Sequence, residues 1–113
     1  MNDIKLMNKA ADNIRILAAS MVEKAKSGHP GGAMGGADFV NVRFSEFLVY
    51  DPKNPAWEGR DRYFQDPGHM SPMLYSVLAL TGKFTIDELK EFRQWGSVTP
   101  GHPEVNVMRG IEN

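Results

Sequence analysis

The sequence predicts a predominantly helical fold with one short strand, and two observations carry that prediction. Apolar residues recur every three or four positions over long stretches of the 113-residue chain, which is the spacing of helices with one buried face. A β-prone run with two aromatic residues occupies residues 62–65 and ends at the turn sequence Asp66-Pro67-Gly68. We therefore expect helices that pack around one modest core, with residues 62–65 as the strand.

The first two expected helices flank a glycine-rich stretch. Residues 3–26 carry apolar side chains at helical spacing, with Asn2 or Asp3 as the N-cap and Gly28 as the left-handed stop. Residues 36–49 form the second helix and carry apolar side chains on two faces. Both helices should bury one face or more.

The last two expected helices follow the strand. Ser71 can cap the third helix, whose residues are apolar nearly all round up to Gly82, so this helix should lie in the core. Thr85 and Glu88 have the spacing of a capping box at the start of the fourth helix. Beyond Trp95 the chain becomes irregular.

The composition restricts the partners and the compartment. A net charge of −1 gives no electrostatic reason to expect nucleic acid or an anionic membrane as a partner. No stretch approaches the roughly 20 apolar residues that span a bilayer. The chain has no cysteine, which excludes disulfides and thiolate metal sites and fits a reducing compartment. We therefore expect a cytoplasmic chain that binds neither nucleic acid nor membrane.

Residues 27–36 are expected to form a loop. This stretch contains five glycines and one proline, which disfavour the interior of a helix or strand. Its backbone amides could cradle a phosphate, although the lysine of a P-loop is missing. His29 supplies a titratable ring at its centre, so the stretch is a candidate ligand-facing segment.

Each of the three histidines follows a glycine, in the pairs Gly28-His29, Gly68-His69 and Gly101-His102. With glycine at about a tenth of the residues, a random arrangement would give this pattern in roughly one chain in a thousand. Loops at the ends of elements can converge on one pocket, where imidazoles bind phosphate, sugar hydroxyls or a reacting proton. Three unrelated surface turns are the alternative, because glycine and histidine both favour loops. A three-histidine metal site lacks the i, i+4 spacing of local zinc motifs.

Three motifs in this order resemble the beginning of transketolases. They are Ser27-Gly28-His29-Pro30-Gly31, then Asp61-Arg62-Tyr63-Phe64 leading to Gly68-His69-Met70-Ser71, and finally Thr99-Pro100-Gly101-His102-Pro103-Glu104. The similarity covers nearly the whole chain, and three motifs at the right separations are far more specific than any one of them. The resemblance implies an α/β class in which residues 1–113 are a truncated N-terminal part of the thiamine diphosphate-binding fold.

The resemblance also implies an activity, cofactors and partners. Transketolases transfer a two-carbon ketol unit from a ketose phosphate to an aldose phosphate, with thiamine diphosphate and a divalent cation such as magnesium. Carried over by motif, His29 and His102 are catalytic residues that contact hydroxyl and carbonyl oxygens of the donor, and His69 binds the cofactor diphosphate. The expected partners are sugar phosphates and the remaining transketolase segments or a complementary chain, in a homo-oligomer.

The sequence departs from the family in places. Pro67 and Met70 replace small or polar residues that often flank this histidine, and Met70 is expected to narrow the approach of the cofactor. The chain has no Gly-Asp-Gly metal motif and stops at Asn113, before a glycine-rich segment of the family. We therefore expect the isolated chain to be inactive, with no metal ligand and no bound cofactor. The alternatives are a piece of a related dihydroxyacetone synthase and a noncatalytic module that binds a phosphate compound or a protein.

Overall fold

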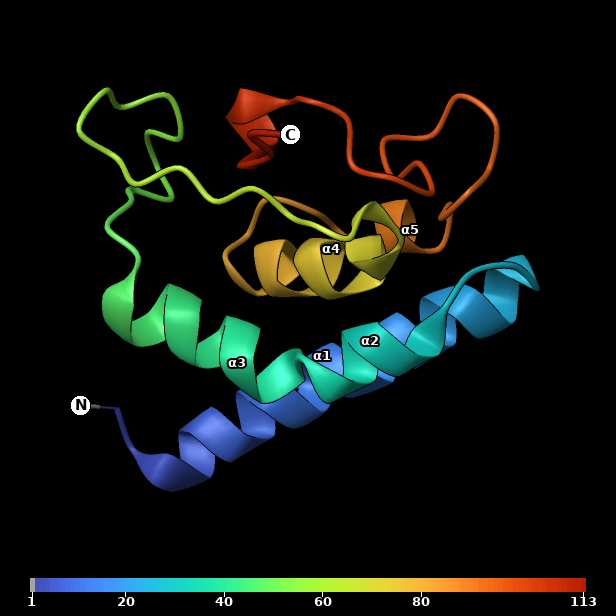
Figure 1. The fold of residues 1–113 in the computed structure, drawn as a ribbon, viewed down its shortest axis with the longest axis horizontal. Helices are drawn as coiled ribbons and strands as arrows, with labels where there is room; N and C mark the ends of the chain where they lie inside the picture. The colour runs from blue at the N-terminus through green and yellow to red at the C-terminus, as the bar shows by residue number, and fades with distance from the viewer. Residues whose placement is uncertain (1) are drawn as a thin grey trace.

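The computed structural model describes residues 2–113, which are predominantly helical, as predicted (Figure 1). The α-helices are α1 (Ile4–Ala25), α2 (Pro30–Gly35), α3 (Ala37–Val42), α4 (Ser71–Leu80) and α5 (Ile86–Leu89). A π-helical turn, η1 (Arg43–Phe47), continues α3, and two 3-10 turns are η2 (Gly68–Met70) and η3 (Val107–Arg109). Within the described part of the chain, every helix is too short or too polar to cross a lipid bilayer.

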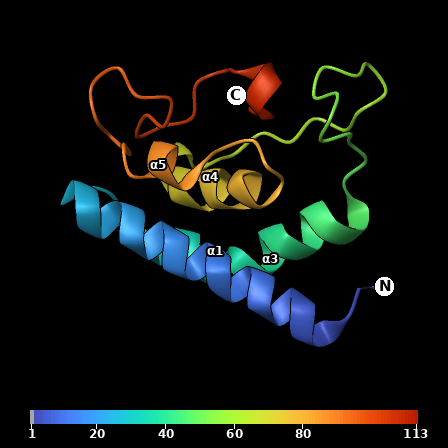
Figure 2. The ribbon, with the colours of Figure 1, turned by 180° about the vertical axis from the view of Figure 1, so that it is seen from behind.

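Helix α1 packs against α2, α3 and α4, and these four helices supply most of the core, to which Phe84, Phe92 and Ile111 add from the later segments. The two opposite views show that the irregular segments, including the C-terminus, lie on the side of α4 away from α1 (Figures 1 and 2). Residues 71–78 of α4 are all buried, which confirms the expected core helix. Helix α4 therefore lies between the layer formed by α1, α2 and α3 and the layer formed by the irregular segments.

Helix α1 begins as predicted but ends differently. The Asp3 carboxylate accepts a hydrogen bond of 3.0 Å from the backbone N–H of Leu6, so Asp3 is the N-cap. The left-handed residue after the helix is Lys26, with φ of 52°, whereas Gly28 was predicted. Lys26 donates its backbone N–H to the carbonyl of Glu23 and pairs with the Glu23 carboxylate, contacts that hold a conformation usually left to glycine.

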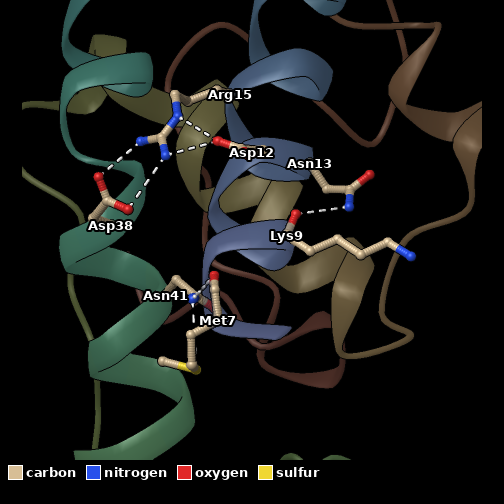
Figure 3. Close-up of polar contacts among 7 residues, drawn as sticks. All are labelled: Met7, Lys9, Asp12, Asn13, Arg15, Asp38 and Asn41. Atoms are coloured by element: carbon tan, nitrogen blue, oxygen red, sulfur yellow. Dashed lines mark hydrogen bonds and ion pairs between the residues drawn. The ribbon is translucent and has the colours of Figure 1, made fainter. Parts of the chain in front are cut away.

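Polar contacts join α1 to α3 (Figure 3). The Arg15 guanidinium lies between Asp12 at 3.0 Å and Asp38 at 2.9 Å, and its hydrogen bonds lower the pKa of the Asp38 carboxyl. Farther along, the buried Asn41 donates its amide N–H to the backbone carbonyl of Met7 over 2.9 Å. These contacts set the register of α3 on α1.

The prediction of a loop over residues 27–36 is wrong, because Pro30–Gly35 form α2. Proline fits the first turn of a helix, where its missing N–H is not needed. A Cβ on Gly32 would lie 2.8 Å from Cγ of Met70, and one on Gly36 would lie 2.6 Å from Sδ of Met73. These two glycines therefore serve a close approach of α2 to the methionines of η2 and α4, rather than an irregular backbone.

The predicted strand over residues 62–65 does not form. A strand needs the backbone of a neighbour, but here the side-chain amide of Asn113 takes that place. Its Oδ1 accepts the N–H of Gln65 and its Nδ2 donates to the carbonyl of Gln65, both over 2.9 Å. The β-pairing found within residues 2–113 is an isolated bridge between Asn106 and Ile111.

A buried ion pair holds the C-terminal segment to the same region. The Glu112 carboxylate accepts hydrogen bonds from Nε and Nη2 of Arg60 over 2.6 Å and 3.2 Å, and both side chains are 8% exposed. This pairing raises the pKa of Arg60, so the guanidinium stays charged. Two parallel hydrogen bonds fix its orientation as well as its position.

The remaining helix boundaries show one confirmed cap and one wrong one. Thr85 and Glu88 form the predicted capping box, each side chain accepting the backbone N–H of the other. Ser71 lies inside α4, with Met70 at the N-cap position, and its hydroxyl donates to the carbonyl of Gly101 instead. The second predicted helix ends in the π-helical turn at Phe47, two residues early.

Candidate functional site

His29 lies between the first two helices, at the N-cap position of α2. Gly28 before it has φ of +122°, a region that L residues rarely adopt. A Cβ at Gly28 would also lie 3.2 Å from the Phe92 ring and 3.3 Å from Val22. Glycine therefore lets the chain turn closely over these side chains, and the His29 side chain is left exposed.

His69 lies in η2, immediately before α4, and is half-buried. Its ring centroid is 4.8 Å from that of His29, and the two ring planes are inclined by 60°. Helix α2 packs against η2, and this packing brings the two rings together.

His102 lies in the irregular segment that follows α5, and its ring packs on the backbone of η2. A Cβ on Gly68 would lie 2.9 Å from Nδ1 of His102 and 3.1 Å from its Cγ. The third imidazole thus occupies the space that a side chain on Gly68 would take, next to His69. His102 itself is exposed.

Two hydroxyl groups of α4 hold the segment that carries His102. Ser71 Oγ donates to the carbonyl of Gly101, and the Tyr75 hydroxyl donates to the carbonyl of Pro100, each over 2.6 Å. Tyr75 is fully buried, and this burial raises the pKa of its phenol, which therefore stays protonated as a donor. Because α4 also begins at η2, one rigid helix positions both His69 and His102.

The structure therefore brings His29, His69 and His102 together from three segments far apart in the sequence. The alternative of three unrelated surface turns does not agree with this arrangement. An open groove is lined in part by Ser27, Gly101 and Glu104, which lie within two residues of His29 or His102 in the sequence. The catalytic and binding roles of the histidines stay predictions.

Two other ligand interpretations are affected by the structure. The backbone N–H of Gly36 is bonded within the helical stretch to the carbonyl of Gly32, so this amide does not serve a phosphate cradle. Among residues 2–113, no three His, Asp or Glu side chains are arranged to hold a metal ion. Met70, expected to narrow the approach of the cofactor, directs its side chain against Gly32.

Sequence reasoning missed the residues that hold the histidines in place. Ser71 and Tyr75 are four residues apart, so they share one side of a helix that is otherwise largely apolar. That spacing could have predicted that one side of α4 forms hydrogen bonds with a neighbouring segment. Arg93, which contacts the segments of both His29 and His102, gave no comparable signal.

Comparisons with known proteins agree with the resemblance. A family model described as the thiamine diphosphate-binding domain of transketolase matches residues 6–113. The transketolase of Buchnera aphidicola subsp. Baizongia pistaciae is 52% identical over 108 residues, which cover 95% of this chain and 16% of that protein.

Two solved structures extend the similarity to the fold. The transketolase of Campylobacter jejuni is 46% identical with a TM-score of 0.91, over 98% of this chain and 17% of its own. The Pichia stipitis transketolase, solved in complex with sedoheptulose 7-phosphate, is 43% identical with a TM-score of 0.88, over 94% of this chain and 16% of its own.

These relatives are all named transketolase, so the dihydroxyacetone synthase and the noncatalytic module are not favoured. The chain spans only 16% or 17% of their length. On the match over residues 6–113, the chain belongs to the transketolase family and falls within its thiamine diphosphate-binding domain.

Proposed function

We propose that residues 1–113 form the N-terminal part of the thiamine diphosphate-binding domain of a transketolase. The complete enzyme would transfer a two-carbon ketol unit from a ketose phosphate to an aldose phosphate. The observation that carries this proposal is the convergence of three imidazoles, with the rings of His29 and His69 4.8 Å apart and His102 against Gly68. Family membership supports the reaction class.

His29 and His102 are the residues we assign to the donor sugar. Both side chains are exposed beside the half-buried His69, so a ligand can reach them. An imidazole can donate a hydrogen bond to a carbonyl or hydroxyl oxygen, and it can accept or return a proton near neutral pH. Their proposed task is to orient the donor carbonyl and to move protons between its oxygen atoms and solvent.

His69 is the residue we assign to the cofactor. Its ring N–H, or the protonated imidazolium, is a suitable donor to a diphosphate oxygen. When bound, thiamine diphosphate supplies the carbon nucleophile and the electron sink of this chemistry. The donor set suits the diphosphate, whereas no three His, Asp or Glu side chains of residues 2–113 are grouped for a divalent cation. We therefore assign magnesium no ligand among them.

The proposal extends to the setting of the chain. A sugar phosphate as substrate is supported by the Pichia stipitis relative, which was solved with one. We propose that the chain works with the remaining transketolase segments or a complementary chain, in a cytoplasmic homo-oligomer. We propose that a polypeptide of these 113 residues alone does not turn over substrate, since the described residues 2–113 contain no group of three His, Asp or Glu side chains arranged to hold a metal ion.

Separate substitutions of the histidines in the complete protein test these assignments. His29→Ala and His102→Ala should each lower kcat/KM for the donor about 100-fold or more, with little change in the Kd of thiamine diphosphate. His69→Ala should instead weaken cofactor binding first. The reverse pattern, with His102→Ala weakening the cofactor and sparing donor turnover, would overturn the assignment.

Calorimetry on the 113-residue chain provides a second test. With thiamine diphosphate and magnesium present, we expect no measurable binding heat, while the complete enzyme serves as the positive control. Tight binding by the chain alone would show that it holds a cation site after all.

A further inference from the structure

Arg93 follows α5 and has an unusual backbone conformation. Its φ is +62°, in the left-handed region that costs free energy for a residue with a side chain. Its backbone N–H donates to the carbonyl of Thr99 over 3.0 Å, which closes the intervening turn. The left-handed residue thus joins the end of α5 to the segment that leads to His102.

The Arg93 side chain lies between the segments of two histidines. Its Nη1 donates to the hydroxyl of Ser27 over 2.8 Å, two residues before His29. Its Nε lies 3.0 Å from where a Cβ of Gly101 would be, one residue before His102. On the first segment, the same Nε is 3.6 Å from the Cβ position of Gly28. One guanidinium therefore fills the space between the Gly28-His29 and Gly101-His102 pairs.

Arg93 retains a second unfavourable feature. Its Nε is buried and has no hydrogen-bond partner, which costs free energy because the N–H has lost its water. The guanidinium carbon lies 5.6 Å from the centre of the Phe92 ring, so the planar group packs over an aromatic face. Arg93 thus carries two costs, a left-handed backbone and an unpaired N–H. Both are explained if the role of the guanidinium is to occupy the space between the two histidine segments rather than to complete its own hydrogen bonds.

We propose that Arg93 is a positioning residue that sets the separation between His29 and His102. This inference rests on the proposed function, in which those two imidazoles share the donor sugar. The flat guanidinium acts as a spacer against Gly101, and its hydrogen bond to Ser27 fixes the other segment. A lysine can donate to the Ser27 hydroxyl but has no planar group to fill the space beside Gly101.

Kinetics on the complete protein test the spacer. Arg93→Gln should lower kcat/KM for the donor about 10- to 100-fold, the range expected when reacting groups are displaced by about 1 Å. The Kd of thiamine diphosphate should change less than about threefold, because the contacts of Arg93 described above do not include His69, whose ring should therefore keep its place. Arg93→Lys should recover only part of the loss. Lys90→Gln is the control, because it also removes one positive charge but at an exposed residue directly after α5. It should leave donor kcat/KM and the Kd of thiamine diphosphate unchanged.

A double substitution tests the contact itself. Gly101→Ala should lower donor kcat/KM because its Cβ would meet Nε of Arg93. In the Arg93→Ala background the same change should cost much less, since the neighbour has been removed. Independent, additive losses would overturn the steric argument.

The outcomes separate this inference from the proposed function. If His29→Ala and His102→Ala abolish donor turnover while Arg93→Gln stays within twofold of the wild type, the positioning role fails alone. If the histidine variants keep donor turnover, the proposed function fails. Circular dichroism checks folding, and should Arg93→Gln unfold, the same kinetic split measured on Arg93→Lys decides the matter.

Discussion

Gly68 and His102 are in such close contact that a single methyl group could not be placed between them. A Cβ on Gly68 would lie 2.9 Å from Nδ1 of the imidazole, closer than real Cβ atoms approach. Two other glycines are packed slightly less tightly. A Cβ on Gly101 would lie 3.0 Å from Nε of Arg93, and one on Gly28 would lie 3.2 Å from the Phe92 ring. The glycine that precedes each histidine therefore makes room for a neighbouring side chain of the site.

Gly68→Ala should move the His102 ring out of its place beside His69. Donor kcat/KM in the complete protein should fall about 10- to 100-fold, because the imidazole loses its alignment. Steady-state kinetics with the donor varied measures this effect, and an alanine variant with wild-type donor kinetics would contradict the packing argument.

The glycines of the α2 region should respond to alanine in two classes. Gly32→Ala and Gly36→Ala should destabilise the chain by about 1–3 kcal/mol, because their Cβ atoms would overlap Met70 and Met73. Gly31→Ala and Gly35→Ala meet no atom within 4 Å and should be neutral or stabilising by up to about 1 kcal/mol. Urea unfolding of the four variants measures the contrast, and equal effects in both classes would argue against tight packing of α2.

Tyr75→Phe should destabilise the chain by about 1–2 kcal/mol, because the carbonyl of Pro100 loses its donor. The segment that carries His102 should also become more mobile, which amide hydrogen exchange of residues 99–104 can detect. Ser76→Ala is the matched control, since its hydroxyl bonds to the carbonyl of Pro72 within α4. Faster exchange in the control but not in Tyr75→Phe would contradict the proposed anchoring.

Glu88 should make stability depend on pH in the acid range. Its pKa is lowered by the hydrogen bond from Arg109, at 2.6 Å, and by the backbone N–H of Thr85. A carboxyl whose pKa is lower in the folded state stabilises the fold above its unfolded pKa of about 4.3, and the contribution is lost as pH falls through the folded pKa. Glu88→Gln should therefore be less stable than the wild type at pH 7 and approach it at pH 2–3, which thermal unfolding across this range can measure.

The sequence allowed the helices with local signals to be predicted. The capping box of Thr85 and Glu88 depends on residues within one turn, so the pattern places it, and the N-cap of α1 was narrowed to Asn2 or Asp3, of which the structure has Asp3. The glycine-histidine pairs left convergence and three unrelated surface turns both open, and the resemblance to transketolases favoured convergence.

Two of the wrong predictions, the loop over residues 27–36 and the strand over residues 62–65, depend on contacts between distant residues. Each glycine lowers helix propensity by about 1 kcal/mol, and that local cost argued against α2. The compensating contacts of Gly32 are with Met70, which lies far along the chain, so no local signal predicts them. Residues 62–65 have strand propensity but depend on a neighbour, and the side chain of Asn113 provides only part of one.

The methionine that lies against Gly32 makes this region sensitive to oxidants. A Cβ at Gly32 would be 2.9 Å from Sδ of the half-buried Met70, so no space is left for an added oxygen atom on the side of the sulfur that faces Gly32. Peroxide should convert Met70 to the sulfoxide, force α2 away from η2 and separate His29 from His69. Mass spectrometry together with imidazole NMR signals would detect both events, and Met70→Leu should resist them. Oxidation of Met70 alone would thus displace His29 and His69 without modifying either ring. A methionine sulfoxide reductase could reverse the change.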